Sequence, residues 1–209
     1  MIAVDGGAEV GEALGLDPEV VIGDMDSLRP AQRDLLASRG VAEHRFPPDK
    51  DATDLELALD LAHRRWPEHR LVVLGGGGGR FDHLVVNLAV LSGPLVRSAH
   101  TTWLTIDAHV TILRGPAEAR FHLAEGELVS LLAMHGRATG VTTRGLSWPL
   151  DRAELHSGSG LGLSNVATRD DVHGTAGAGA ADAGGPGPAD VEVSVALAQG
   201  VLTVIRPLG

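Results

Sequence analysis

The sequence predicts an α/β domain with a parallel sheet over residues 1–107, followed by an antiparallel β-sandwich domain over residues 108–209. In the first part, short apolar runs alternate with helical patterns, which is the rhythm of βαβ units. In the second part no helical period survives, and short extended runs are separated by Gly, Pro and Asp. The length of 209 residues suits one large or two small domains, and an apolar content of 44% is enough for a sizeable core.

Strands of the first domain are predicted at Met1–Val4, Glu19–Ile22, Glu43–Phe46, Leu71–Leu74 and Thr102–Ile106, of which the first and the fourth are expected to be buried and the third is weaker. Between them we expect a short helix up to Leu14, a helix from Pro30 to Gly40 capped by Ser27, and a helix over Phe81–Leu91. The clearest helix follows Thr53, which forms a capping box with Glu56. In this helix Leu55, Ala58, Leu59 and Ala62 line one apolar face.

Extended runs of the second domain are predicted at His109–Leu113, Ala119–Leu123, Leu128–Ala133, Arg137–Thr142, Ala153–His156, Val191–Leu197 and Val201–Arg206. Gln199 and Gly200 are predicted to form a hairpin turn between the last two. Residues 174–189 are almost entirely Gly, Ala and Pro, so we expect a flexible loop at about 172–190 whose deletion is tolerated.

The composition excludes several classes of protein. Acidic residues number 27 against 17 Lys and Arg, and the net charge of −10 argues against nucleic-acid or anionic-membrane partners. Because the chain has no cysteine, disulfides, thiolate metal sites and cysteine nucleophiles are excluded. No apolar run approaches the roughly 20 residues of a membrane helix. No basic-then-apolar leader follows Met1, so we expect a cytoplasmic protein.

Carboxylates follow the predicted strands of the first domain, at Asp5, Asp24, Asp26, Asp49, Asp51, Asp54 and Asp82. The carboxyl ends of parallel strands lie along one edge of a sheet, so we expect these acids to meet in one crevice. Their repulsion favours a bound cation, and carboxylate oxygens suit Mg²⁺ shared with substrate phosphates. Lys50, Arg80 and the glycine run Gly75–Gly79 supply groups for phosphate at the same edge. The pattern indicates a metal–nucleotide site.

Each piece alone has a simpler interpretation. The tripeptide Asp5-Gly6-Gly7 could simply form a turn, and Asp26 or Ser27 could be an ordinary helix N-cap. The residues around Thr53 are explained by the start of a helix, and the glycine run lacks the spacing of known phosphate-binding fingerprints. None of the ten histidines has metal-ligand spacing. Only the coincidence of these features at strand ends favours a site.

Several motifs in order resemble those of the thiamine pyrophosphokinase family. They are Ala3-Val4-Asp5-Gly6-Gly7-Ala8, Gly23-Asp24-Met25-Asp26-Ser27, Asp49-Lys50-Asp51-Ala52-Thr53-Asp54-Leu55 and Gly78-Gly79-Arg80-Phe81-Asp82-His83. In the second half, Gly145-Leu146-Ser147-Trp148-Pro149-Leu150 and Ser164-Asn165 resemble two further motifs of that family. The resemblance spans nearly the whole chain.

This resemblance implies an α/β domain followed by a β-sandwich, a homodimer with shared active sites, and Mg²⁺-dependent transfer of pyrophosphate from ATP to thiamine, giving thiamine diphosphate and AMP. The metal would lie on Asp24, Asp26 and Asp54, and catalysis would also involve Asp82 and Arg80. Thiamine would contact Ser164 and Asn165. The ATP and phosphate site would comprise Asp5, Gly6, Gly7, Ser27, Lys50, Asp51, Thr53, Gly78, Gly79, His83 and Asn87.

Three features depart from the family pattern. The chain begins at the Ala-Val-Asp-Gly-Gly strand, Val166 follows Ser164-Asn165 where Glu is common, and the Gly/Ala/Pro segment is additional. Asp82 and Asp24 are both candidates for accepting the thiamine hydroxyl proton. Two other functions remain open: a metal-dependent phosphohydrolase, and a non-catalytic homologue that binds thiamine or a nucleotide.

Overall fold

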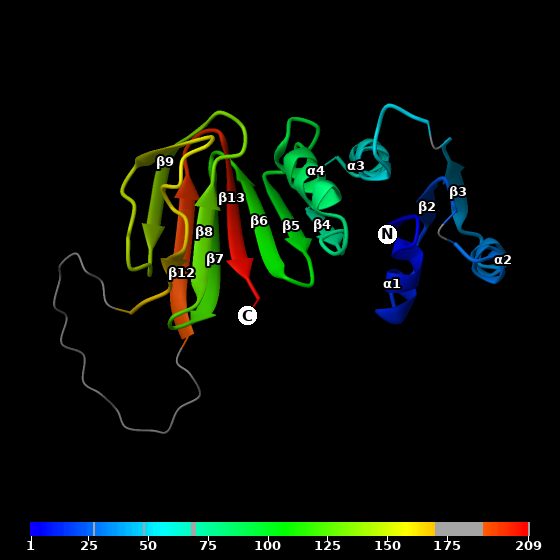
Figure 1. The fold of residues 1–209 in the computed structure, drawn as a ribbon, viewed down its shortest axis with the longest axis horizontal. Helices are drawn as coiled ribbons and strands as arrows, with labels where there is room; N and C mark the ends of the chain where they lie inside the picture. The colour runs from blue at the N-terminus through cyan, green and yellow to red at the C-terminus, as the bar shows by residue number, and fades with distance from the viewer. Residues whose placement is uncertain (27, 48, 68–69, 170–189, 209) are drawn as a thin grey trace, which may run out of the picture. The chain divides into compact units, whose positions relative to one another are not determined.

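The computed structural model describes residues 1–26, 28–47, 49–67, 70–169 and 190–208, and its contacts form two compact units (Figure 1). One unit comprises residues 1–69 and 94–97, and the other comprises residues 70–93 and 98–209. This division differs from the boundary predicted at 107/108, which stays a prediction. Most of the predicted loop at about 172–190 lies outside the described residues, and so does Ser27.

The first unit is a three-stranded parallel sheet in the order β1-β2-β3 with three helices. In chain order its elements are β1 (Ile2–Val4), α1 (Gly7–Ala13), β2 (Val20–Gly23), α2 (Pro30–Ser38), β3 (Ala42–Arg45) and α3 (Asp54–Arg65). Side chains of successive strand residues point to opposite faces. Accordingly Val21 packs with Met25 and Leu36 on one face, whereas Val20 and Ile22 pack against α3 on the other.

The second unit contains two sheets and helix α4 (Phe81–Ser92). The six-stranded sheet has the order β11-β8-β13-β6-β5-β4, and the four-stranded sheet has the order β10-β9-β12-β7. The strands are β4 (Leu71–Leu74), β5 (His100–Leu104), β6 (Ala108–Arg114), β7 (Ala117–Ala124), β8 (Leu128–Leu132), β9 (Arg137–Arg144), β10 (Ala153–His156), β11 (Asn165–Val166), β12 (Asp190–Leu197) and β13 (Val201–Pro207).

The inner faces of the two sheets form the core of the sandwich. Leu113, Leu131 and Leu202 of the six-stranded sheet lie in one cluster with Val141 and Val193 of the four-stranded sheet, and each is fully buried. Burial of such side chains contributes roughly 1.5–3 kcal/mol each. The α/β part with a parallel sheet and the antiparallel sandwich confirm the predicted fold class.

The predicted single parallel sheet is divided between the two units. Strand β4 pairs in parallel with β5, but β5 continues antiparallel to β6, so both strands belong to the six-stranded sheet. The turn between β5 and β6 is fixed by the Thr105 hydroxyl, which accepts from the Ala108 backbone N–H at 2.9 Å. Figure 1 shows α4 beside these strands. The acids after β1 and β2 therefore belong to the first unit, and Asp82 after β4 belongs to the second.

Two local predictions were wrong. Gln199 and Gly200 do not form a hairpin: β12 belongs to the four-stranded sheet and β13 to the six-stranded one, so the segment crosses between sheets. Gly200 has φ +93° there, and a Cβ on it would lie 2.1 Å from the Arg137 carbonyl oxygen. The N-cap of α2 is Arg29 rather than Ser27, and the Gln32 side chain accepts from its backbone N–H at 3.3 Å. Within the described residues, no helix is long and apolar enough to cross a membrane.

Candidate functional site

Asp5 follows β1 and lies directly against β2. Its backbone N–H donates to the Ile22 carbonyl at 3.0 Å, and its φ is +43°. Gly23, at the end of β2, has φ +145°, and a Cβ there would lie 1.7 Å from Asp5 Oδ1. Only glycine therefore lets the carboxylate approach the end of the neighbouring strand.

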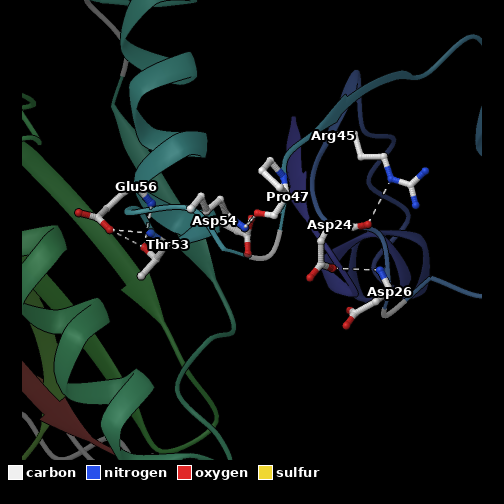
Figure 2. A network of polar contacts seen from close by, with 8 residues as sticks. Asp24, Asp26, Arg45, Pro47, Thr53, Asp54 and Glu56 are labelled. Carbon is white, nitrogen blue, oxygen red and sulfur yellow. Dashed lines mark hydrogen bonds and ion pairs between the residues drawn. The ribbon is translucent and has the colours of Figure 1, made fainter.

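The turn after β2 is held by the Asp24 side chain. Asp24 Oδ1 accepts from the Asp26 backbone N–H at 3.0 Å, and Arg45 Nε donates to the Asp24 carbonyl at 3.4 Å (Figure 2). The hydrogen bond from Asp26 is the main cause that lowers the pKa of Asp24, with Lys50 and Arg45 contributing through their charge. Met25 between the two acids has φ +68° and a buried side chain, which anchors the turn.

Helix α3 begins beside this turn with the predicted capping box. Thr53 Oγ1 accepts from the Glu56 backbone N–H at 3.2 Å, and Glu56 Oε2 accepts from the Thr53 backbone N–H at 2.8 Å. Asp54 is the first residue of the helix, where the dipole favours a negative charge. Lys50 Nζ lies 2.9 Å from Asp54 Oδ1 and donates to the Pro47 carbonyl at 3.3 Å (Figure 2 labels both partners).

The carboxylates of Asp5, Asp54 and Asp24 repel one another. Burial, then the charge of Asp54 and to a smaller extent that of Asp24, raises the pKa of Asp5 to about 6. Within the described residues, Asp5 Oδ1 and Asp54 Oδ1 are buried without a hydrogen bond when both side chains are ionised, whereas a proton on Asp5 is shared with Asp54 and adds to the raised pKa. The contact of Lys50 with Asp54 is thus an ion pair rather than a directed bond. The cluster has more negative charge than its neighbours compensate.

This cluster fits a divalent cation that is shared with a ligand. No three acidic or histidine side chains in the described part of the chain are arranged to hold a metal alone. Mg²⁺ does not need such a cage, because it commonly uses one or two carboxylates, waters and substrate phosphates. The two buried carboxylate oxygens without hydrogen bonds are the observation that fits this group.

In the second unit, the glycine run after β4 is held in place by two side chains. Trp103 Nε1 donates to the Gly75 carbonyl at 2.7 Å, and Asn87 Nδ2 donates to the Gly76 carbonyl at 2.9 Å. Gly77 lies so close to Thr105 that a Cβ on it would be 2.5 Å from that side chain. The run is therefore a fixed loop that leads into α4, and the linker interpretation does not apply to it.

Arg80 and Asp82 form a bidentate ion pair at the start of α4. Arg80 Nε donates to Asp82 Oδ1 at 3.1 Å, and Arg80 Nη2 donates to Oδ2. The hydrogen bonds from Arg80 lower the pKa of Asp82 to about 2. A phosphate that binds Arg80 would have to compete with this carboxylate.

The predicted thiamine residues lie at β11, where they support other groups. Asn165 is 2% exposed; its Oδ1 accepts from the Trp148 backbone N–H at 3.0 Å, and its Nδ2 donates to the Trp148 carbonyl at 2.7 Å. Ser164 has φ +56°, and its backbone N–H donates to Ser130 Oγ at 3.0 Å. Asn165 thus holds the backbone of Trp148, whose side chain is 63% exposed.

The other predicted residues divide between the two units. In the first unit, Gly6 is the N-cap of α1, Gly7 is its first residue and Asp51 is exposed. In the second unit, Gly78, Gly79 and His83 are exposed around the start of α4. Sequence reasoning missed Arg45 and Trp103 as side chains near these sites, and it noted Trp148 only as part of a motif. Two of them are among only three tryptophans in the chain, which is the signal that could have singled them out.

A three-stranded α/β unit with acids at its strand ends, joined to a β-sandwich, defines a two-part protein with a polar ligand site. Comparison with known proteins specifies the family. Residues 1–103 match the description "Thiamin pyrophosphokinase, catalytic domain", and residues 113–175 match "Thiamin pyrophosphokinase, vitamin B1 binding domain". The chain belongs to the thiamine pyrophosphokinase family.

Individual relatives agree with this assignment. The chain is 29% identical over 163 residues to thiamine pyrophosphokinase 2 of Oryza sativa subsp. japonica, an alignment that covers 74% of this chain and 60% of the rice protein. It is 28% identical over 165 residues to the Bacillus subtilis (strain 168) thiamine pyrophosphokinase, and this alignment covers 78% of this chain and 76% of the Bacillus protein. The chain thus spans about 60% of the length of the rice relative.

Solved structures share the fold. The crystal structure of thiamine pyrophosphokinase from Bacillus subtilis has a TM-score of 0.71 at 22% identity, covering 100% of this chain and 87% of that one. The crystal structure of yeast thiamin pyrophosphokinase has a TM-score of 0.63 at 15% identity, covering 99% of this chain and 78% of the yeast chain.

Proposed function

We propose that this protein transfers pyrophosphate from ATP to the hydroxyl of thiamine, giving thiamine diphosphate and AMP with Mg²⁺ as the cofactor. The observation that carries the proposal is the Asp5–Asp24–Asp54 cluster with its two buried, unbonded carboxylate oxygens, in a chain that matches both parts of this family.

Asp24, Asp26 and Asp54 would hold the metal, and Asp5 would face it from β1. When bound, Mg²⁺ would supply positive charge against the triphosphate. Pyrophosphoryl transfer asks little covalent chemistry of the protein, so the side chains act by positioning and by charge. Asp24 and Asp82 are the candidate proton acceptors, and both have lowered pKa values, so both are ionised at neutral pH.

Arg80 would bind phosphate oxygens with the fork that now holds Asp82. Its planar guanidinium donates two parallel hydrogen bonds, which suits a phosphate as well as a carboxylate. The fixed loop Gly75–Gly79 precedes α4, whose N-terminus attracts anions. Asn87 would contribute indirectly, because its amide nitrogen already holds the Gly76 carbonyl.

Thiamine would bind against Trp148 beside Ser164. Thiamine is a cation, and the face of an exposed tryptophan ring attracts cations. Asn165 fixes the Trp148 backbone from both sides, so we assign Asn165 the role of presenting this ring. Loss of the Asn165 amide would then weaken thiamine binding without a direct contact to thiamine.

We further propose a homodimer in which each active site combines the acidic cluster of one chain with the Ser164 region of the other. Asp24→Asn and the double variant Ser164→Ala with Asn165→Ala should each lose most of the wild-type activity. Unfolded and refolded together, they should regain part of the wild-type activity, because heterodimers contain one intact site. A mixture as inactive as its parents would exclude shared sites.

The activity is tested by measuring AMP release with and without thiamine. Thiamine-dependent AMP that requires Mg²⁺ is the expected result. Thiamine-independent release of phosphate would instead identify a phosphohydrolase, and thiamine binding without turnover would identify a non-catalytic homologue.

A further inference from the structure

Lys50 is the only lysine in the chain. The other 16 of the 17 basic residues are arginines, and this single lysine lies in the acidic cluster of the first unit. Its side chain is 14% exposed, and its ammonium lies 2.9 Å from Asp54 Oδ1. Its hydrogen bond goes to the backbone carbonyl of Pro47 at 3.3 Å.

The Lys50 ammonium lies beside carboxylate oxygens that would also stabilise a bound metal cation. Asp54 Oδ1 is buried and receives no hydrogen bond from the described residues, and neither does Asp5 Oδ1. The charge of Lys50 also acts on Asp24, across the same cluster. Arg45 also acts on Asp24 through its charge, so two positive charges serve the cluster, and Lys50 is in contact with Asp54 without a directed bond to it.

A lysine suits a contact that must be released. An arginine fork binds a carboxylate through two hydrogen bonds at once, as Arg80 does with Asp82. A lysine ammonium is a compact point charge on a flexible stem, and it also binds phosphates. It can leave a carboxylate and turn towards a neighbouring anion without the loss of a bidentate pair.

We propose that Lys50 is an exchangeable counter-ion, which neutralises the carboxylates of the metal-free protein and is displaced from Asp54 when a divalent cation binds. The displaced ammonium becomes available for the phosphates of the nucleotide. This inference rests on the proposed metal site, and it adds that metal binding and release of Lys50 are one exchange.

The first test is calorimetric titration of the nucleotide-free protein with Mg²⁺. Lys50→Met keeps most of the stem but removes the competing charge, so Mg²⁺ should bind about tenfold more tightly than to the wild type. Lys50→Arg is the matched control and should bind Mg²⁺ no more tightly than the wild type. Equal affinity in Lys50→Met and the wild type would overturn the exchange and leave the metal site standing. No binding to any of the nucleotide-free proteins would overturn the exchange, because no metal would then displace Lys50 before the nucleotide binds.

The second test uses the wild-type chain and needs no variant to fold. Since Lys50 carries the only side-chain amine, acylation by an amine-specific reagent, followed by mass spectrometry, reports on this residue alone, with the terminal amine as internal reference. Mg²⁺ should raise the rate of Lys50 acylation several-fold relative to NaCl of equal ionic strength. A rate that Mg²⁺ leaves unchanged would overturn the proposal.

Discussion

At the scale of single residues, two of the four non-glycine residues with positive φ in the described part of the chain lie at the acidic cluster. Asp5 and Met25 both have positive φ angles, and so does Gly23, which ends β2 with φ +145°. Non-glycine residues in this region cost on the order of 1–2 kcal/mol each. The buried side chain of Met25 and its backbone hydrogen bond to the Asp5 carboxylate maintain this geometry. The strain therefore accompanies the placement of Asp5 beside the turn of Asp24.

Gly23→Ala tests this close approach. The new Cβ would lie 1.7 Å from Asp5 Oδ1, so the variant should lose roughly 3 kcal/mol of the free energy of unfolding. Gly15→Ala is the matched control, because Gly15 has φ +69° with nothing within 4 Å. It should lose only about 1 kcal/mol. Urea unfolding measures both, and equal losses would contradict the steric argument.

Asp24→Asn tests the catalytic charge. The amide oxygen of asparagine can still accept from the Asp26 backbone N–H, so the turn should persist. We expect kcat to fall about 100-fold, which corresponds to roughly 3 kcal/mol of barrier, with stability almost unchanged. The same fall is expected for Asp26→Asn. Asp17 is an exposed acid of the same unit, so Asp17→Asn is the control and should keep normal turnover. Normal turnover in Asp24→Asn would remove Asp24 from the metal site.

Asp5 makes the metal-free protein sensitive to pH. Its pKa in the folded chain is about 6 against an ordinary value of 3.8, so the folded state holds a proton that the unfolded state has already lost. The stability gained is fully present below pH 3.8 and is lost as the pH rises through 6. The melting temperature of Asp5→Asn minus that of the wild type should therefore increase between pH 4 and pH 7.5. A constant difference would show that Asp5 does not titrate in this range.

At the scale of elements, a short-range signal was sufficient to place the start of α3. Thr53 and Glu56 are three residues apart, and their capping box places the start of α3 as predicted. The glycine run could not be interpreted in this way. Its tethers come from Asn87, 11 residues beyond Gly76, and from Trp103, 28 residues beyond Gly75. Local composition permits a linker and a fixed loop equally.

Trp103→Phe tests the tether of this loop. Phenylalanine retains an aromatic ring but cannot donate to the Gly75 carbonyl. One lost hydrogen bond of about 1 kcal/mol should raise the KM for ATP several-fold. The KM for thiamine should stay at its wild-type value, because the loop lies on the proposed phosphate site. Steady-state kinetics with each substrate varied in turn distinguish the two, and an unchanged KM for ATP would contradict the positioning role.

At the scale of the whole molecule, strand pairing is where sequence reasoning failed. The alternation of strands and helices gave no sign that β5 pairs with antiparallel β6 as well as with parallel β4. Likewise, the turn at Gln199-Gly200 has the composition of a hairpin, although its flanking strands belong to different sheets. Pairing partners are chosen by the packing of the sandwich core, which residues near a turn do not encode. The motifs nevertheless identified the acids that lie together in the first unit.

The transfer of an isotopic label tests the central claim most directly. The protein is incubated with thiamine, Mg²⁺ and ATP labelled at the β-phosphorus, and the products are separated. Because the proposed reaction moves the β- and γ-phosphoryl groups together, the label should appear in thiamine diphosphate, with unlabelled AMP released in equal amount. Label that stays in ADP, or that appears as free phosphate or pyrophosphate without entering a thiamine compound, would contradict the proposed function.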